Sequence, residues 1–416
     1  MKRTSDVLVL GGGVIGLACA LYLLDAGRGV TVVERGSVGC ASSHGNCGTL
    51  TPSHAAPLAA PGTISTALHW LLKADAPLRI APRFDPALLR WLLAFAGHCN
   101  ERDYLHATRV KAPLLLRSRE LIEGLVRRER LACEFESLGT LNVFRDQRTF
   151  EEAHAAYARL APFGIPVEPL DAAATLAREP ALKPGVVGSL FNPIDASLRP
   201  DCYVDELARL VRARGGTILE GTAVDGIVRS GDRIDHVATS AGELAAGDVV
   251  MALGAWSPRF ARALDLRIPI QPGKGYSITY TRPAQCPRLP LTLKEPSVCV
   301  TSWGSGYRLG STMEFAGYDE RLNRTRLDAL RRGAAAYLYQ PEGPEVVEEW
   351  YGWRPMTPDD LPVIGRAPGV SNLILATGHG MLGVTLSAVT GELVRDIACR
   401  RAPSFDLAPL SPARFG

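Results

Sequence analysis

The sequence predicts an α/β fold in which a Rossmann-like nucleotide-binding domain is interleaved with a second domain built on a mixed or antiparallel sheet. Three observations predict it. A glycine-rich turn joins a strand to a helix at the N-terminus, a second strand, glycine-rich turn and helix lie near the C-terminus, and alternating strand patterns occupy part of the interval. With 416 residues, 46% of them hydrophobic, the chain can bury a core in each domain.

The N-terminal segment "DVLVLGGGVIGLACALYLLDAGRGVTVVER" has the order of a nucleotide-binding βαβ unit. A buried strand is followed by a helix that closes at Gly27, and a second strand ends on Glu34. Gly11, Gly13 and Gly16 give the GxGxxG spacing between the first strand and the helix. Because a carboxylate follows at the end of the next strand, the segment predicts a dinucleotide site.

Each part of this unit has a physical task. Gly11 permits the tight turn, Gly13 lets the backbone approach a pyrophosphate, and Gly16 lets the helix pack close to the strand. The N-terminus of the helix offers unpaired N–H groups and the positive end of its dipole. Glu34 can accept hydrogen bonds from both ribose hydroxyls of an adenosine and would repel a 2′-phosphate, which argues against NADP.

The choice between FAD and NAD depends on two later segments. Residues 39–62, "GCASSHGNCGTLTPSHAAPLAAPG", are small and polar, so their backbone can lie beside a large cofactor and donate amide hydrogens to it. An NAD enzyme usually proceeds to a third strand sooner. A flavin also needs a second contact far along the chain, and such a contact would favour FAD.

Residues 372–398, "NLILATGHGMLGVTLSAVTGELVRDIA", predict that second contact. The pattern is a buried strand over 372–376, a turn over 377–383 and a helix from 385 onward. The N-terminus of this helix can stabilise negative charge on a reduced flavin. His379 in the turn has two interpretations: a residue near the flavin that tunes its charge, or a turn residue hydrogen-bonded to the backbone.

The central part predicts helices around one strand at 139–144, a helix over 201–214 with Asp201 as N-cap, and an antiparallel sheet within 268–349. Because nucleotide-type segments recur at the start, middle and end, the two domains are expected to alternate along the chain. We assign residues 1–83, 185–262 and 350–416 to the FAD-binding domain, and residues 84–184 and 263–349 to the substrate-binding domain.

Composition excludes several classes of function. The net charge is only +3 and no basic block is present, which argues against nucleic acid. Nine cysteines without a CxxC pair favour neither a disulfide framework nor a metal site, and they indicate a reducing compartment. No signal peptide and no apolar run of membrane-spanning length is expected. The apolar stretch 88–96 predicts a buried helix, the alternative being a face that docks on a membrane or a partner.

The segment "WYGWRPMTPDDLPVIG", residues 350–365, places Arg354 among aromatic side chains. The aromatic rings are expected to exclude water and strengthen the field of the guanidinium. Asp359 and Asp360 follow closely, and the sequence does not decide whether either pairs with Arg354. A charged guanidinium among apolar side chains is explained if the substrate supplies its counter-ion.

The whole chain resembles the FAD-dependent D-amino-acid oxidase superfamily, and within it the small subunit of bacterial D-amino-acid dehydrogenases. The matching motifs are "GGGVIG", "HAAPLAAPG", "KGYS", "GWRPMTPDDLPVIGR" and "TGHGMLG". The resemblance implies a flavin between the two domains and oxidation of a D-amino acid to an imino acid, which is hydrolysed to a keto acid if acyclic. Electrons would pass to the respiratory chain or to another protein acceptor.

The resemblance assigns the substrate carboxylate to Arg354, the arginine of the "GWRP" motif. Two-point contact would direct Cα–H toward flavin N5 for hydride transfer and select one enantiomer. Tyr276 and Lys274 are the other expected pocket residues, and no side-chain base is assigned. The segment "YRLGSTMEFAGYDERLNRTRL" resembles relatives in hydroxyproline catabolism, which favours cis-4-hydroxy-D-proline or D-proline, and otherwise a D-alanine-like substrate.

Two alternatives stay open: a flavin oxidase of glycine or sarcosine-type amines that uses oxygen, and a flavin electron-transfer subunit of a larger complex. The expected location is cytoplasmic, with peripheral contact to the inner membrane or to a partner subunit left open. The expected FAD-binding residues are Gly11, Gly13, Val14, Ile15, Gly16, Glu34, Arg35, Ser42, Ser43, Asn46, Cys47, Gly48, Val224, Gly254, Gly378, His379, Gly380, Met381, Leu382 and Gly383.

Overall fold

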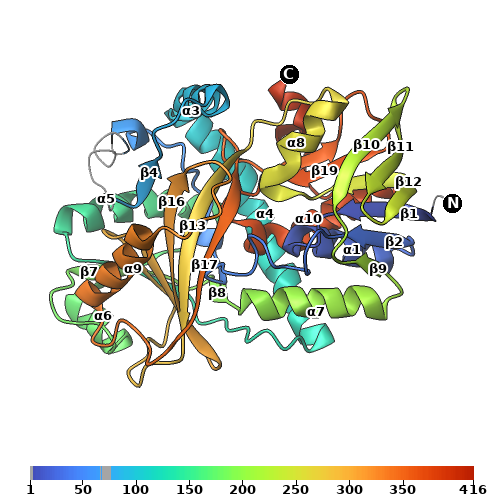
Figure 1. The fold of residues 1–416 in the computed structure, drawn as a ribbon. Helices are drawn as coiled ribbons and strands as arrows, with labels where there is room; N and C mark the ends of the chain where they lie inside the picture. Colours follow the sequence, from blue (N-terminus) through green and yellow to red (C-terminus); the bar gives the residue numbers. More distant parts are fainter. Residues whose placement is uncertain (1–2, 66, 68–75) are drawn as a thin grey trace.

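The computed structural model describes residues 3–65, 67 and 76–416, and it contains two large sheets with helices around them (Figure 1). One sheet carries the first and last strands of the chain, and the other is mainly antiparallel. The predicted fold class, an α/β nucleotide-binding unit combined with a mixed and antiparallel sheet, is confirmed. The two chain ends lie on the lobe that contains the first sheet (Figure 1).

The first sheet has the strand order β10-β11-β12-β1-β2-β9, with β19 beside β12 and β18 beside β19. β1, β2, β9 and β19 run parallel to their neighbours, apart from the antiparallel pair of β19 with β18. Its strands are β1 (Arg3–Leu10), β2 (Val30–Val33), β9 (Thr217–Leu219), β10 (Val224–Ser230), β11 (Arg233–Thr239), β12 (Gly242–Met251), β18 (Val363–Arg366) and β19 (Leu373–Thr377).

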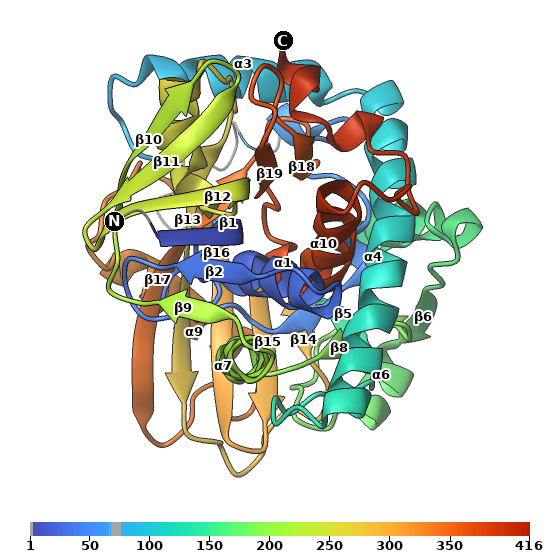
Figure 2. The same cartoon turned by 90° about the vertical axis from the view of Figure 1, so that its right-hand side faces the viewer.

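Helices α1 (Val14–Asp25) and α10 (Gly383–Ala398) pack against each other beside this sheet (Figure 2). Both helices are buried over most of their length, α1 mainly through apolar residues and α10 through apolar and polar residues, because each lies between the sheet and further helices. The predicted strand–turn–helix units at both ends of the chain are therefore confirmed. They bring two helix N-termini to the carboxyl edge of one sheet, where ligands bind in folds of this class.

The second sheet has the order β17-β13-β16-β15-β14-β5-β7-β6, with β4 beside β16. Leu291, Leu293, Val298 and Val300 on its middle strands are buried in one apolar cluster with α9 (Arg324–Tyr337). The face of the sheet opposite α9 can line a site. Its strands are β4 (Leu78–Ile80), β5 (Thr140–Phe144), β6 (Glu168–Asp171), β7 (Gly188–Asn192), β13 (Gln271–Tyr280), β14 (Leu291–Leu293), β15 (Val298–Trp303), β16 (Gly306–Phe315) and β17 (Val346–Met356).

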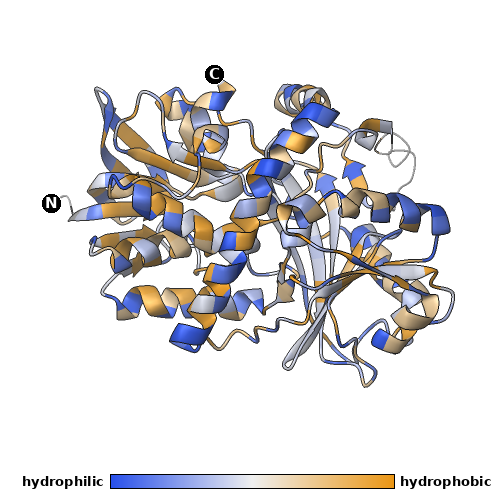
Figure 3. Cartoon of the chain, turned by 180° about the vertical axis from the view of Figure 1, so that it is seen from behind, coloured by the Kyte–Doolittle hydropathy of each residue, from blue (hydrophilic) through white to orange (hydrophobic). Residues whose placement is uncertain are grey.

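The remaining described elements connect and cover the two sheets. The long helix α4 packs on α10, and the back view shows its mixed apolar and polar surface (Figures 2 and 3). Within residues 3–65, 67 and 76–416, none of the helices combines the length and apolar character of a membrane-spanning segment. These elements are α3 (Pro86–His98), α4 (Glu101–Glu129), α5 (Gln147–Ala158), α6 (Ala172–Arg178), α7 (Pro200–Ala213), α8 (Ser257–Ala261), and the short pair β3 (Thr49–Leu50) and β8 (Ala196–Ser197).

Two local predictions are wrong. Helix α7 has Arg199 as its N-cap, and Asp201 lies in the first turn, where its carboxylate accepts from the Arg199 guanidinium. Helix α3 is not buried throughout: Leu88 is buried, but Leu89 and Leu93 are 59% and 66% exposed. The run 88–96 is apolar around the helix, and only one face of α3 packs on the protein.

Three elements pack with a different part of the structure from the domain to which their residue ranges were assigned. β4 and β7, which fall in segments assigned to the FAD-binding domain, pair within the second sheet. α4, which falls in a segment assigned to the substrate-binding domain, packs on α10. Sheet membership alone does not define a domain, so the division by residue range stays a prediction.

A buried ion pair joins α4 to the segment that carries the predicted arginine. Lys111, 1% exposed, donates to Asp360 at 2.6 Å, and the same carboxylate oxygen accepts from the backbone of Leu58 at 3.1 Å. Asp360 thus holds together α4, the loop around residue 58 and the turn after β17. Asp360 also has a positive φ of 57°, a conformation that asparagine tolerates.

We predict that Lys111→Met lowers the free energy of unfolding by about 3 kcal/mol or more, because it leaves a buried carboxylate without its counter-ion. The double variant Lys111→Met/Asp360→Asn removes both charges and should recover most of the loss. Urea unfolding of both variants measures this. Equal stability of the single variant and the wild type would contradict the assigned role.

Candidate active site

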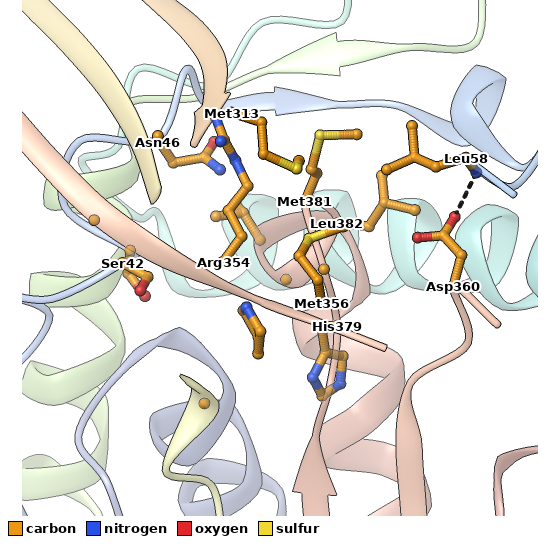
Figure 4. Close-up of a pocket in the computed structure, with 18 of the residues that line it drawn as sticks. Ser42, Asn46, Leu58, Met313, Arg354, Met356, Asp360, His379, Met381 and Leu382 are labelled. Atoms are coloured by element: carbon orange, nitrogen blue, oxygen red, sulfur yellow. Dashed lines mark hydrogen bonds between the residues drawn. The ribbon is translucent and has the colours of Figure 1, made fainter. Parts of the chain in front are cut away.

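A cavity of about 1070 Å³ is lined by residues of both sheets and of the loops between them (Figure 4). Most of the predicted FAD-binding residues lie on its wall. The structure brings together Gly11, Gly13, Val14, Ile15, Glu34, Arg35, Ser42, Ser43, Asn46, Cys47, Val224, Gly254, His379, Gly380, Met381, Leu382 and Gly383.

Three predicted glycines, Gly16, Gly48 and Gly378, lie behind the wall instead. A Cβ on Gly16 would overlap the carbonyl oxygen of Gly11, so Gly16 sets the close approach of α1 to the turn. Gly48 and Gly378 have positive φ values of 71° and 73° and pack against neighbouring backbone or side chains. These residues shape the cavity without facing it.

The N-terminal turn forms a cradle of backbone groups. Gly11 has a φ of 104°, which favours glycine, and a Cβ there would lie 2.6 Å from the carbonyl oxygen of Ala252. Glu34 accepts hydrogen bonds from the amides of Gly12 and Gly36 at 2.8 and 3.0 Å. Its carboxylate is therefore held at the carboxyl end of β2, where the sequence places a ribose contact.

The loop after β2 is clamped from the second sheet. Arg308 on β16 donates to the carbonyl oxygens of His44 and Asn46 at 3.0 and 2.7 Å. Ser42 donates to the carbonyl oxygen of Trp353 on β17. Because these bonds join the two lobes, the loop that borders the nucleotide cradle is fixed relative to the second sheet.

His379 lies at the C-terminal turn with its ring buried. Thr390 donates its hydroxyl hydrogen to the carbonyl oxygen of Leu386, so His379 Nε2 is the donor in its 2.9 Å bond to the Thr390 hydroxyl. Burial lowers the pKa of His379 to about 3. The ring is neutral, and its partner is a side chain rather than the backbone.

Arg354 projects from β17 into the cavity and lacks a counter-ion within the described part of the chain (Figure 4). Its guanidinium donates to the carbonyl oxygen of Thr312 at 2.7 Å. Asp359 pairs with Arg414 at 2.7 Å, and Asp360 pairs with Lys111. The question that the sequence left open is answered: neither aspartate neutralises Arg354. Burial lowers the pKa of this guanidinium, which reflects the cost of an unpaired charge.

In the pairing of β17 with β13, Arg354 lies opposite Gly273. The guanidinium lies directly over Gly275 of β13, where any Cβ would overlap its atoms. Trp350 and Gly352 line the cavity with Arg354, since residues two apart share a face. The expectation that all three aromatic rings surround Arg354 is wrong, because Tyr351 and Trp353 point to the opposite face.

Lys274 and Tyr276 lie on that opposite face as well. The Lys274 ammonium donates to the carbonyl oxygens of Asp319 and Arg321, and it is outside the cavity lining. Tyr276 reaches the lining, but its hydroxyl donates to Glu314. The structure therefore places Lys274 outside the cavity and Tyr276 on its wall, and contact of Tyr276 with the substrate stays a prediction. The physical reason is the period of two along β13, which puts Gly275 toward the cavity and its neighbours toward α9.

Sequence reasoning missed Cys299 and Lys294, which line the cavity from the second sheet. Cys299 lies in contact with Cys47, and its pKa is lowered, first by that thiol and then by Thr292, Arg354 and Lys294. The alternation of the strand "VCVTSW" was visible in the sequence. The sequence did not show which face of this strand meets the cavity, because that depends on its pairing with β14 and β16.

The chain belongs to the DAO family of FAD-dependent oxidoreductases, whose family model matches residues 6–397. The resemblance inferred from the motifs is therefore confirmed. The D-amino acid dehydrogenase of Rhizorhabdus wittichii is 36% identical over 421 residues, which cover 98% of this chain and all of the relative. The D-amino acid dehydrogenase of Phenylobacterium zucineum is 36% identical over 419 residues, 98% of each chain.

Solved structures agree in fold. Glycine oxidase from Geobacillus kaustophilus superposes with a TM-score of 0.81 at 25% identity and covers 99% of both chains. L-proline dehydrogenase from P. horikoshii gives a TM-score of 0.75 at 20% identity, over 100% of this chain and 98% of that chain, and it supports the fold alone.

The cavity residues fit FAD. Neither α1 nor α10 receives a side-chain hydrogen bond from its own N-cap residue, Gly13 or Leu382. Their first N–H groups are thus available to a ligand, apart from that of Val14, which donates to Ser43. The glycine cradle and Glu34 suit the nucleotide half, and the start of α10 suits the flavin half.

We predict that Gly275→Ala leaves FAD content and melting temperature close to wild type but weakens binding of an unreactive carboxylate such as benzoate. The new methyl group displaces the Arg354 guanidinium, and small misplacements of an anchoring group cost on the order of 10²-fold. Perturbation of the flavin absorbance gives the affinity. Gly306→Ala, which meets its neighbours at ordinary contact distances, is the control. Unchanged benzoate affinity in Gly275→Ala would contradict this placement of Arg354.

Proposed function

We propose that this flavoprotein is a D-amino-acid dehydrogenase, which oxidises the Cα–N bond of its substrate to an imine. The observation that carries the proposal is Arg354, a cavity-facing guanidinium with no carboxylate partner among the described residues. In a family of FAD-dependent oxidoreductases, such a group suits the carboxylate of an amino acid. The names of the relatives support the same substrate class.

The chain's own residues orient the substrate. Arg354 fixes the carboxylate by two parallel hydrogen bonds, which a lysine could not provide with the same geometry. The Thr312 carbonyl and Gly275 hold the guanidinium in place before substrate arrives. Trp350 and Met356 cover neighbouring parts of the wall and exclude water, which strengthens the ion pair. Bound FAD supplies the acceptor for the hydride that leaves Cα.

The roles of several predicted residues follow from these positions. His379 is neutral, so we propose that it supports the turn before α10 rather than supplying positive charge to the flavin. No side chain is assigned as a base, since a substrate amine that arrives neutral can release hydride without one. Electrons then pass to the respiratory chain or another protein acceptor, and the location is proposed as cytoplasmic with peripheral contact to the inner membrane.

Among D-amino acids, the sequence resemblance favours cis-4-hydroxy-D-proline or D-proline, with D-alanine-like substrates next. An anaerobic bleaching screen tests both the proposed class of substrate, D-amino acids, and the favoured members of that class. Purified protein is mixed with matched D- and L-amino acids, including the hydroxyproline isomers, and the loss of flavin absorbance is followed. Bleaching by D-isomers is expected. Bleaching by L-isomers alone overturns the stereochemical assignment, and peroxide formation in air would point to an oxidase instead.

We predict that Arg354→Ala lowers kcat/KM for D-amino acids by an amount equivalent to about 2–5 kcal/mol, because a desolvated charge pair is lost. Arg354→Lys should fall between Arg354→Ala and wild type, since the charge is kept and the two-point contact is lost. Arg148→Ala, at an exposed helical position, is the matched control. Steady-state kinetics with an artificial electron acceptor measures all three. A loss of less than a few-fold in Arg354→Ala would refute the assignment.

A further inference from the structure

A second cation lines the same cavity at a distance from Arg354. Lys294 follows β14, and its half-buried side chain faces the cavity. Within the described part of the chain, its ammonium has no hydrogen-bond partner and no counter-ion, and it lies 6.0 Å from the centre of the Tyr157 ring. Burial lowers the pKa of Lys294, so its surroundings disfavour the charge until an anion arrives.

The charges of Cys299 and Glu295 favour the charged form of Lys294, but none of the ion pairs or hydrogen bonds among the described residues joins either group to this ammonium. The adjacent carboxylate, Glu295, accepts from the amides of Arg145 and Asp146 and from the hydroxyl of Tyr337. His54, which also lines the cavity, has its pKa lowered to about 4 by burial and then by the positive charges of Lys294 and Lys111. The His54 ring is therefore neutral, and the Lys294 side chain faces the cavity.

Strand register places Lys294 and Arg354 at two ends of one surface. Cys299 on β15 pairs with Gly310 on β16 and with Thr292 on β14, so these residues share the cavity face. Lys294 lies two residues beyond Thr292 on that face. The Arg354 guanidinium reaches β16, where it bonds to Thr312.

The separation of the two cations limits the ligand. The backbone of β16, to which Arg354 bonds, and that of β14, which Lys294 follows, are two strands apart, which corresponds to about 10 Å between the backbones. Two charge-assisted hydrogen bonds take about 5–6 Å of that span. The remaining length fits the short carbon chain of a four- or five-carbon dicarboxylate. A cyclic amino acid anchored at Arg354 would leave Lys294 unused.

Resting on the proposed function, we propose that Lys294 forms an anion subsite for the side-chain carboxylate of a dicarboxylic D-amino acid, D-aspartate or D-glutamate. The α-carboxylate pairs with Arg354 and the second carboxylate with Lys294. Cys299 lies on β15, between β14 and β16, and both Cys299 and the neighbouring Cys47 line the cavity as small side chains. The subsite extends the substrate range beyond the neutral amino acids.

The first experiment compares each acid with its amide, which has nearly the same shape and no second charge. Wild type is expected to show a kcat/KM for D-glutamate or D-aspartate roughly tenfold or more above that for D-glutamine or D-asparagine. Lys294→Met should reduce this ratio to near one, and Lys294→Arg should keep most of it. Lys183→Met, which removes a lysine that bonds to the Ala335 carbonyl oxygen, is the control for net charge.

A second measurement needs no turnover. Isothermal titration of the FAD-loaded protein with glutarate and with its monoamide compares one and two carboxylates directly. Wild type is expected to prefer glutarate by roughly tenfold or more, and Lys294→Met to lose this preference. Equal binding of glutarate and monoamide by wild type, or a preference that survives in Lys294→Met, overturns the subsite. Failure of every D-amino acid to bleach the flavin would reject the proposed function while the titration still tests the subsite.

Discussion

The proposed site depends on the charge of Arg354, which has no counter-ion among the residues that the structure describes. Arg354 lies at the wall of an apolar cavity, and the two nearest aspartates in sequence are committed to Arg414 and Lys111. An unpaired charge in such a place is costly unless a ligand completes the pair. In the proposed function, the carboxylate of a bound amino acid offsets this cost and fixes the direction of the reacting C–H bond.

The rest of the structure keeps this charge available and in place. Gly275 leaves space for the guanidinium, and the Thr312 carbonyl on β16, where the pairing with β13 shifts in register, accepts its hydrogen bond. The Lys111–Asp360 pair engages a carboxylate that follows Arg354 closely in sequence and joins α4 to the loop around Leu58. Stability and function are thus linked, since the same ion pair that holds three segments together also leaves Arg354 free.

The sequence predicted the parts of this fold that depend on local pattern. Both strand–turn–helix units were recognisable, because glycine spacing and apolar periodicity depend only on residues close together in the sequence. The face of each strand that meets the cavity was not recognisable: Lys274 was expected in the pocket and lies outside it, and Tyr276 lines the pocket with its hydroxyl bonded to Glu314. Lys294 and Cys299 were missed for the same reason, since strand pairing between distant segments decides which face meets the cavity.

The most direct test of the account is a crystal structure of the FAD-loaded protein with an unreactive carboxylate, benzoate, in the cavity. The account predicts both carboxylate oxygens within hydrogen-bond distance of the Arg354 guanidinium, with Asp359 and Asp360 still paired to Arg414 and Lys111. Benzoate bound elsewhere, or Arg354 turned onto a carboxylate of the protein, would contradict it.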